Sequence, residues 1–283
     1  MTNGAVVFAG GGVAGIAWEL GVLRGIEEKR PDVVERILDV GTTFVGTSAG
    51  ASVSAQVAGG TPIADLFETQ LADETTELFV EVDLSQFMGQ LGAAMAEATS
   101  PEDQRRRLGA IAREAKTVEP PVRLAVIDAR LPVKTWPARR LLITAVDATS
   151  GEFRVFDRDS GVGLVEAVAA SCAVPGIWPT VRIDGHEYMD GGMRTVGNVD
   201  LAAGADPVLV LVPSAAQTPI GSAVTADELA ALGSARTHIV YADDASIAAF
   251  GSNPLDPAVR RPAALAGLAI GRRIADEIAD FWS

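Results

Sequence analysis

The stretch VGTTFVGTSAGASVSAQVA, residues 40–58, decides the fold of this 283-residue chain. Its first part, residues 40–45, predicts a strand. Its last part, residues 51–58, is small and apolar. It predicts a helix packed close to a sheet and ended by Gly59 and Gly60. A strand, a five-residue turn and a helix in succession are typical of an α/β fold.

The same alternation continues on both sides of this stretch. Residues 5–9, AVVFA, predict a buried strand, and residues 16–30 predict a helix after a glycine loop. Further strands are predicted at residues 141–146, 152–156, 180–183, 187–189, 207–212 and 237–241, and helices at residues 164–173 and 260–281. Because no repeat, low-complexity tract or linker interrupts the sequence, we expect one domain over residues 1–283. Its fold class would be a three-layer α/β/α sandwich with a mainly parallel central sheet.

Residues 61–120 differ in composition from the rest of the chain. They are mostly helical by propensity and carry Glu-rich and Arg-rich faces, so we expect a helical cap or insertion on the core. The apolar side chains Phe87, Met88, Leu91 and Met95 form a stripe in this segment. Such a stripe is more typical of core packing than of a lipid-facing lid.

The composition restricts the classes of partner. Lys and Arg number 23 against 37 Asp and Glu, which gives a net charge of −14. This charge disfavours a nucleic-acid partner and electrostatic docking on anionic lipid, so we expect at most transient membrane contact. One cysteine allows no intrachain disulfide, and no basic residue precedes the first apolar stretch as a secretory signal requires. We therefore expect a cytoplasmic protein.

A glycine loop, GGGVAG at residues 10–15, connects the first strand to the first helix. It satisfies G-x-G-x-x-G, which makes a dinucleotide-binding oxidoreductase one alternative. Asp32, Glu35 and Asp39 then lie near the expected place of an acidic ribose ligand. The same exposed N–H groups at a helix N-terminus also stabilise an oxyanion. A plain tight turn requires such glycines as well, and the loop alone leaves all three readings open.

The turn Gly46-Thr47-Ser48-Ala49-Gly50 matches G-x-S-x-G between a strand and a helix, which is the setting of a nucleophile elbow. In an α/β-hydrolase, several strands precede the elbow and a histidine follows the acid. Here one predicted strand and one helix precede Ser48. The two histidines, His186 and His238, are expected to be structural. The sequence therefore disfavours a histidine-containing triad.

Asp190-Gly191-Gly192 follows the predicted hairpin and forms a turn of its own. Asp-Gly turns are commonly structural. A carboxylate held by backbone groups beside a serine can also act directly as a general base. Such a role requires a partly dry environment that makes the carboxylate more basic.

Taken in order, these motifs resemble the patatin-like phospholipase family. The resemblance covers residues 5–60, 141–156, 167–192 and 204–213. It implies a Ser-Asp dyad without histidine, with Ser48 as nucleophile and Asp190 as base. The implied substrates are carboxylic esters of lipid-like molecules, namely a phospholipid, a lysolipid or a neutral acyl ester. Neither a cofactor nor a metal is implied.

The resemblance also implies an oxyanion hole. Its donors are the backbone N–H groups of Gly10, Gly11 and Gly12, and the N–H of Ala49 contributes because it follows the nucleophile.

Two positions depart from the family pattern. The family loop reads G-G-G-x-[RK]-G, whereas this chain has Ala14 at the basic position. The family also has an Asn-Pro pair nearer the aspartate than Asn198 is here. The first departure weakens a phospholipase assignment more than a hydrolase assignment. A catalytically silent relative that binds acyl chains or a partner protein is a further alternative. The presence of both dyad residues disfavours it.

Overall fold

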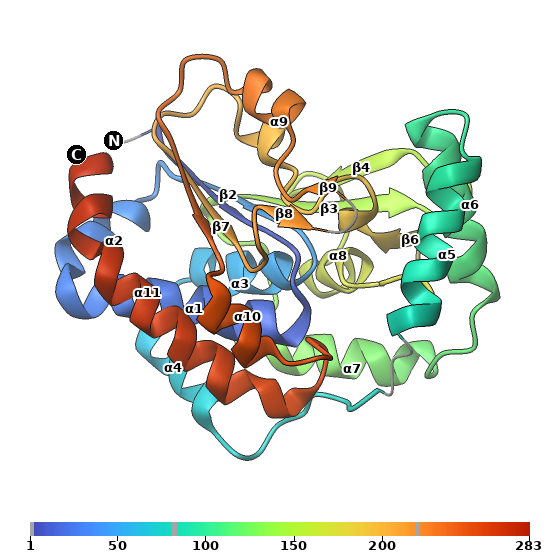
Figure 1. The fold of residues 1–283 in the computed structure, drawn as a ribbon, viewed down its shortest axis with the longest axis horizontal. Coiled ribbons are helices and arrows are strands. Elements are labelled where there is room, and N and C mark those ends of the chain that lie inside the picture. Colours follow the sequence, from blue (N-terminus) through green and yellow to red (C-terminus); the bar gives the residue numbers. More distant parts are fainter. Residues whose placement is uncertain (1–2, 81–83, 219–220) are drawn as a thin grey trace.

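A mainly parallel sheet forms the centre of the molecule (Figure 1). The computed structural model describes residues 3–80, 84–218 and 221–283, without the side chains of residues 84–88. The sheet order is β10-β7-β1-β2-β3-β6-β5, with β4 paired to β3 beside this path. The strands are β1 (Ala5–Phe8), β2 (Thr43–Gly46), β3 (Arg140–Asp147), β4 (Phe153–Phe156), β5 (Val181–Ile183), β6 (His186–Asp190), β7 (Val208–Val212) and β10 (Thr237–Tyr241). A separate ribbon joins β8 (Gln217–Thr218) to β9 (Gly221–Ser222).

Strand direction places the three motifs at one edge of the sheet. β10, β7, β1, β2 and β3 run parallel, whereas β4, β5 and β6 form antiparallel pairs. The glycine loop and the elbow therefore follow the carboxyl ends of the adjacent strands β1 and β2. Asp190 ends β6 and lies opposite Ala145 of β3 in the ladder. Ligands of open α/β sheets bind at this carboxyl edge.

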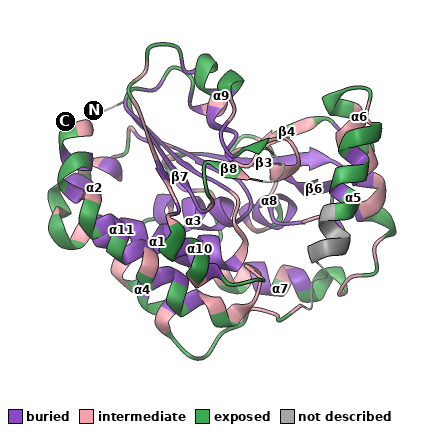
Figure 2. Ribbon diagram, viewed as in Figure 1, coloured by how far each residue is buried: buried purple, intermediate pink, exposed green. Residues whose placement is uncertain are grey.

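Helices cover the sheet unequally on its two faces. The thicker layer contains α1 (Gly12–Lys29), α3 (Ala49–Ala58), α4 (Ile63–Leu71), α8 (Leu164–Ser171) and α11 (Arg260–Phe281). The opposite face is covered by the short helices η2 (Val199–Ala202) and α9 (Ala226–Ala231) and, over β3 and β6, by α5 (Leu84–Glu97) and α6 (Pro101–Glu114). The strands between the two layers are mostly buried (Figure 2). This architecture confirms the predicted α/β fold class.

Glycines allow α1 and α11 to pack closely. A Cβ added to Gly21 would lie 2.2 Å from the Ala264 carbonyl oxygen, and one added to Gly267 would lie 2.1 Å from the Trp18 carbonyl oxygen. Any larger residue at either position would force the two helices apart. The remaining helices are α2 (Pro31–Ile37), α7 (Pro120–Arg130), α10 (Asp244–Phe250), η1 (Gly191–Met193) and η3 (Pro257–Val259).

The helices of residues 61–120 lie in two places. α4 packs against α1 and α11. α5 and α6 pack on each other beside β3 and β6, at the right of Figure 1. Leu91 is buried there in a cluster with Val146 and Met189, and Met95 is exposed. The predicted apolar stripe is therefore split. Its members Phe87 and Met88 have side chains outside the described residues.

Glu19 is a buried carboxyl in α1. The side chain is 0% exposed, and its oxygens make no hydrogen bond of standard geometry with the described residues. Burial raises the pKa of Glu19 well above its ordinary value, and the backbone N–H of Ala9 lowers it by less. Because an isolated buried carboxylate is unfavourable, burial favours the neutral, protonated form of Glu19.

We expect Glu19→Gln to increase stability relative to the wild type as the pH rises. The raised pKa favours the folded state at low pH, and this contribution is lost when the pH rises through the folded pKa. A neutral amide of the same shape does not ionise and avoids that loss. Urea unfolding at about pH 5 and about pH 9 measures the difference. The exposed Glu35→Gln serves as the control, and a pH-independent difference for Glu19→Gln would contradict the expectation.

Candidate active site

Ser48 occupies a strained turn between β2 and α3. Its φ of 55° and ψ of −113° are unusual for a residue with a side chain, and Ala49 already begins the helix. The Ser48 N–H donates to Ser171 Oγ at 2.9 Å, and its carbonyl accepts the Cys172 thiol at 3.1 Å. These contacts hold the strained backbone, as a nucleophile elbow requires.

The glycines on either side of Ser48 are required by close packing. A Cβ on Gly46 would lie 2.1 Å from Ser54 Oγ. A Cβ on Gly50 would lie 2.0 Å from the Phe8 carbonyl oxygen of β1. No other residue fits at these distances, which explains physically why both ends of the motif are glycine.

The glycine loop approaches the elbow from the end of β1. A Cβ built on Gly10 would lie 3.5 Å from the Ser48 Cβ. The Gly10 N–H donates to the Val196 carbonyl at 2.9 Å, so it has no free hydrogen for an oxyanion. In the described part of the chain, the N–H groups of Gly11, Gly12 and Ala49 donate no hydrogen bond. The Gly10 N–H is therefore not available as the expected donor, and the donor roles of Gly11, Gly12 and Ala49 stay predictions.

Asp190 is held at the end of β6. Its Oδ1 accepts the Gly192 N–H at 2.7 Å, and its own N–H donates to the Ala173 carbonyl at 2.9 Å. The residue is 2% exposed. Gly191 must lack a side chain because a Cβ there would lie 2.2 Å from Thr144 Oγ1. The Asp-Gly-Gly turn thus fixes one carboxylate oxygen by the backbone.

The structure brings Asp190 and Ser48 together. Burial raises the pKa of Asp190 to about 6, while the nearby Ser48 hydroxyl, the Gly192 N–H and the charge of Arg123 lower it by less. Asp190 Oδ2 makes no hydrogen bond of standard geometry with the described residues. Catalytic hydrogen bonds are often long or poorly aligned before substrate binds. A carboxyl with this pKa can take up a proton near neutral pH.

A narrow cavity lies beside Ser48. Its lining includes Gly12, Ala49, Arg123, Trp178 and Leu255. Its volume of about 10 Å³ has room for roughly one water. An acyl group therefore enters only if the side chains of this wall move.

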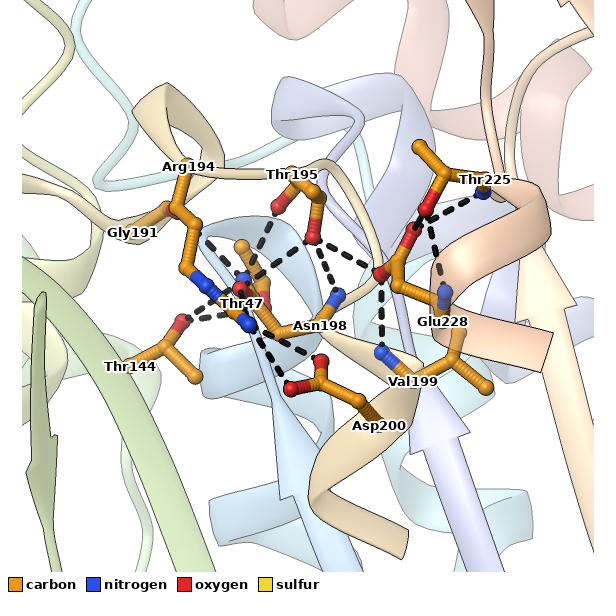
Figure 3. A network of polar contacts seen from close by, with 10 residues as sticks. All are labelled: Thr47, Thr144, Gly191, Arg194, Thr195, Asn198, Val199, Asp200, Thr225 and Glu228. Carbon is orange, nitrogen blue, oxygen red and sulfur yellow. Dashed lines mark hydrogen bonds and ion pairs between the residues drawn. The ribbon is translucent and has the colours of Figure 1, made fainter. Parts of the chain in front are cut away.

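A polar network links the elbow to the aspartate turn (Figure 3). The Asn198 amide donates to Thr47 Oγ1 at 3.0 Å and to the Gly191 carbonyl at 3.3 Å. Asn198 is fully buried in a left-handed conformation, with φ of 50°. It connects the residue before Ser48 to the residue after Asp190. Sequence reasoning noted Asn198 only as a departure from a family pattern and missed this connection.

Neither histidine belongs to the site. The His186 Nδ1 lies 2.7 Å from Asp147 Oδ2, and the side chain is 62% exposed. The His238 Nδ1 lies 3.6 Å from Glu277 Oε1 on α11. Both histidines are thus engaged with carboxylates away from Ser48.

Comparison with known proteins identifies the family. The family model described as patatin-like phospholipase matches residues 6–203, more than half of the chain. The chain belongs to the patatin-like phospholipase family. This match confirms the resemblance seen in the sequence and identifies a lipid acyl hydrolase at the level of the family.

Solved structures of similar fold share little sequence with this patatin-like chain. VipD from Legionella pneumophila is 14% identical, with a TM-score of 0.47 over 98% of this chain and 67% of VipD. The type III effector protein ExoU is 16% identical, with a TM-score of 0.45 over 98% of this chain and 53% of ExoU. The chain thus spans about half the length of ExoU. No curated protein sequence matches it.

The patatin-like fold separates the residues on which the oxidoreductase alternative depends. Asp39 precedes β2 and Gly10 follows β1, and the two strands are parallel, so these residues lie at opposite ends of the sheet. Asp32 instead pairs with Arg30 and Arg36 on the surface. At the carboxyl end of β2, where a Rossmann fold has its acidic ribose ligand, the patatin-like chain has the elbow.

In the described part of this patatin-like chain, no helix combines the length and the apolar character needed to cross a bilayer.

Proposed function

We propose that this protein hydrolyses carboxylic esters of lipid-like substrates through a covalent acyl-enzyme on Ser48. The substrate class is a phospholipid, a lysolipid or a neutral acyl ester. The observation that carries the proposal is the pairing of a strained serine with a buried carboxyl whose pKa is raised to about 6. No histidine is needed in this arrangement because Asp190 itself is basic enough to accept the serine proton.

The proposed reaction proceeds in two halves. Ser48 Oγ attacks the ester carbonyl carbon while Asp190 Oδ2 takes the hydroxyl proton. The tetrahedral intermediate collapses, the alcohol leaves, and Asp190 returns the proton to it. Water then attacks the acyl-enzyme with Asp190 again as base, which releases the carboxylic acid and regenerates Ser48.

The oxyanion of both tetrahedral intermediates is assigned to the N–H groups of Gly11, Gly12 and Ala49. Gly12 and Ala49 line the cavity beside Ser48, and Gly11 precedes Gly12 in the loop. These donors are fixed by packing. A Cβ on Gly11 would lie 2.3 Å from Pro213 Cγ. Preorganised donors of this kind stabilise the developing charge without reorganisation during the reaction.

The apolar wall of the cavity supports a lipid-like acyl group. Val13, Ile16, Val174 and Leu255 line it together with the Trp178 ring. Binding pockets for apolar ligands are lined in this way, with a few polar groups that fix orientation. The acyl chain would lie along these side chains once they have moved apart.

A burst experiment tests the proposal. We expect the wild type to release p-nitrophenol from a medium-chain p-nitrophenyl ester in a burst of about one equivalent per active site, followed by slower turnover. Ser48→Ala should lack the burst because no acyl-enzyme can form. Ser54→Ala, which removes another buried hydroxyl from α3, is the matched control and should retain it. An undiminished burst in Ser48→Ala would overturn the proposal.

A further inference from the structure

A buried cation lies in the wall of the Ser48 cavity. Arg123 of α7 is 5% exposed, and its guanidinium carbon lies 3.7 Å from the centroid of the Trp178 ring. Arg123 Nη1 has no hydrogen-bond partner among the residues that the structure describes. Since Arg123, Trp178 and Ser48 line the same cavity, this unused donor group lies beside the nucleophile.

The neighbouring Arg130 shows how the chain neutralises a buried cation when the role is structural. Arg130 lines the same cavity, but Glu77 accepts two hydrogen bonds from it, at 2.6 Å and 2.7 Å. Within the described residues, Arg123 forms no ion pair of this kind. Burial of an unpaired charge is unfavourable. The Arg123 guanidinium thus has no carboxylate partner of its own, and an anionic ligand can fill that place.

Burial also lowers the pKa of Arg123, and repulsion by Arg130 lowers it further. Attraction by Glu77 and Asp190 offsets only part of this effect. The lowered pKa of about 9 still leaves the guanidinium charged near neutral pH. The charge is therefore available to a ligand and is incompletely balanced by the protein.

Arg123 also lines a second and larger space. A groove of about 610 Å³ is lined by Arg123 together with Leu124, Ala169, Pro179 and Thr180. Grooves of this volume accommodate small-molecule ligands. Because Arg123 borders both the narrow cavity and the groove, a substrate bound to it can react at Ser48 while the rest of the molecule extends into the groove.

We propose that Arg123 binds an anionic oxygen group of the substrate, a phosphate or a carboxylate, while Ser48 attacks the ester. The planar guanidinium offers parallel N–H donors that match either anion. Arg123 then selects anionic esters over neutral esters of the same chain length. The inference rests on the proposed ester hydrolysis and names its substrate class.

Paired esters test this selectivity. p-Nitrophenyl hydrogen adipate carries a carboxylate on the acyl part, and p-nitrophenyl hexanoate is its neutral partner. Hexanoylglycerol phosphate carries a phosphate on the alcohol part, and hexanoylglycerol is its neutral partner. We expect Arg123→Gln to lower kcat/KM about 10- to 100-fold for one anionic ester, and to change it less than about threefold for the neutral partner. The affected pair identifies which part of the substrate carries the anion.

Two further variants separate binding from general electrostatics. Arg154→Gln removes the same charge from an exposed position that lines neither the cavity nor the groove, and it should leave both pairs unchanged. Arg123→Lys keeps the positive charge but lacks the parallel N–H donors of the guanidinium. It should therefore recover part of the activity that Arg123→Gln loses on the anionic ester. Equal losses on neutral and anionic esters in Arg123→Gln would assign Arg123 a structural role and overturn the inference.

Direct binding decides the matter independently of turnover. Calorimetric titration of the wild type with glycerol 3-phosphate and with adipate measures affinity for the two anions. We expect one of the two anions to bind. Arg123→Gln should bind that anion at least tenfold more weakly, and a thermal melt verifies that the variant is folded. If neither anion binds the wild type, the inference is wrong even when esters are cleaved. If binding is seen but no ester is cleaved, the proposed hydrolysis fails instead.

Discussion

Asp190→Asn is expected to lower kcat/KM by about 10³-fold, because an amide cannot accept the Ser48 proton. The shape of the side chain is preserved, and its Oδ1 can still accept the Gly192 N–H. The elbow and the glycine loop stay in place. The loss therefore measures the base alone, and single-turnover ester cleavage by both proteins gives the ratio.

The pH profile of the wild type tests the same role. Asp190 acts as a base only when ionised, and burial raises its pKa to about 6. The value of kcat/KM should therefore fall tenfold for each pH unit below about 6 and level off above it. A flat profile through the acid range would exclude Asp190 as the base.

Stability should move in the opposite direction from activity. The pKa of Asp190 is higher in the folded protein than its ordinary value of 3.8, so its contribution to stability is complete at low pH and is lost as the pH rises through about 6. The corresponding loss for the wild type is about 3 kcal/mol at high pH. Asp190→Asn cannot ionise and does not lose this stability, so it should unfold at a higher urea concentration than the wild type near pH 8. A variant that is more stable and much less active cannot owe its lost activity to misfolding.

Asp147→Asn is the matched control for this experiment. Asp147 is also a buried carboxylate, on the neighbouring strand β3, and it accepts the N–H groups of Thr149 and Ser150. It lies opposite Tyr188 in the ladder rather than beside Ser48. We expect this variant to keep its activity below its melting temperature. Equal activity losses in the two variants would indicate a general electrostatic effect.

Asn198→Ala should reduce both stability and the rate of acylation. The amide makes the contacts of Figure 3 to Thr47 and Gly191, and it also donates to the Thr195 carbonyl at 2.9 Å. Removing it leaves buried acceptors unpaired, which costs about 2–3 kcal/mol of unfolding free energy. Because Thr47 and Gly191 flank the dyad, we expect kcat to fall about tenfold or more while KM changes little. Urea unfolding and burst kinetics measure the two effects.

Two other variants refine this test. Asn198→Gly suits the positive φ but lacks the amide, so it isolates the loss of hydrogen bonds from backbone strain. Asp200→Asn weakens only the outer ion pair with Arg194, where the N–O distance is 2.7 Å, and should affect acylation little. If all three variants keep the wild-type kcat, Asn198 does not position the dyad.

Local patterns in the sequence predict much of the fold. The strands β1, β2 and β7 follow from apolar runs and lie within a few residues of their expected bounds. The elbow and the Asp-Gly-Gly turn are also recognisable, because close packing leaves only glycine at Gly46, Gly50 and Gly191. In these places a steric requirement determines the residue type within a short segment, so the sequence motif is sufficient to predict the local structure.

Other features depend on contacts between distant segments and have no local signal. Arg123 lies in an ordinary amphipathic helix, and only the packing of α7 against α8 brings it to the cavity. The bond from Gly10 to Val196 spans nearly two hundred residues, so the sequence could not show that this N–H is already occupied. α2 begins at Pro31, which suits a helix N-terminus, whereas the sequence pattern predicts only the helix of residues 16–30 in this region.

The glycine loop, encoded near the start of the chain, is completed by its last third. Pro213 packs against Gly11, the Pro254 carbonyl accepts the Ala14 N–H at 2.9 Å, and Leu255 closes the cavity. β1 also lacks one of its two neighbours until β7 has been made. During synthesis, a growing chain thus carries Ser48 and Asp190 long before they have a finished cavity. The candidate site is therefore complete only after the segment that contains Pro254 and Leu255 has packed against the glycine loop.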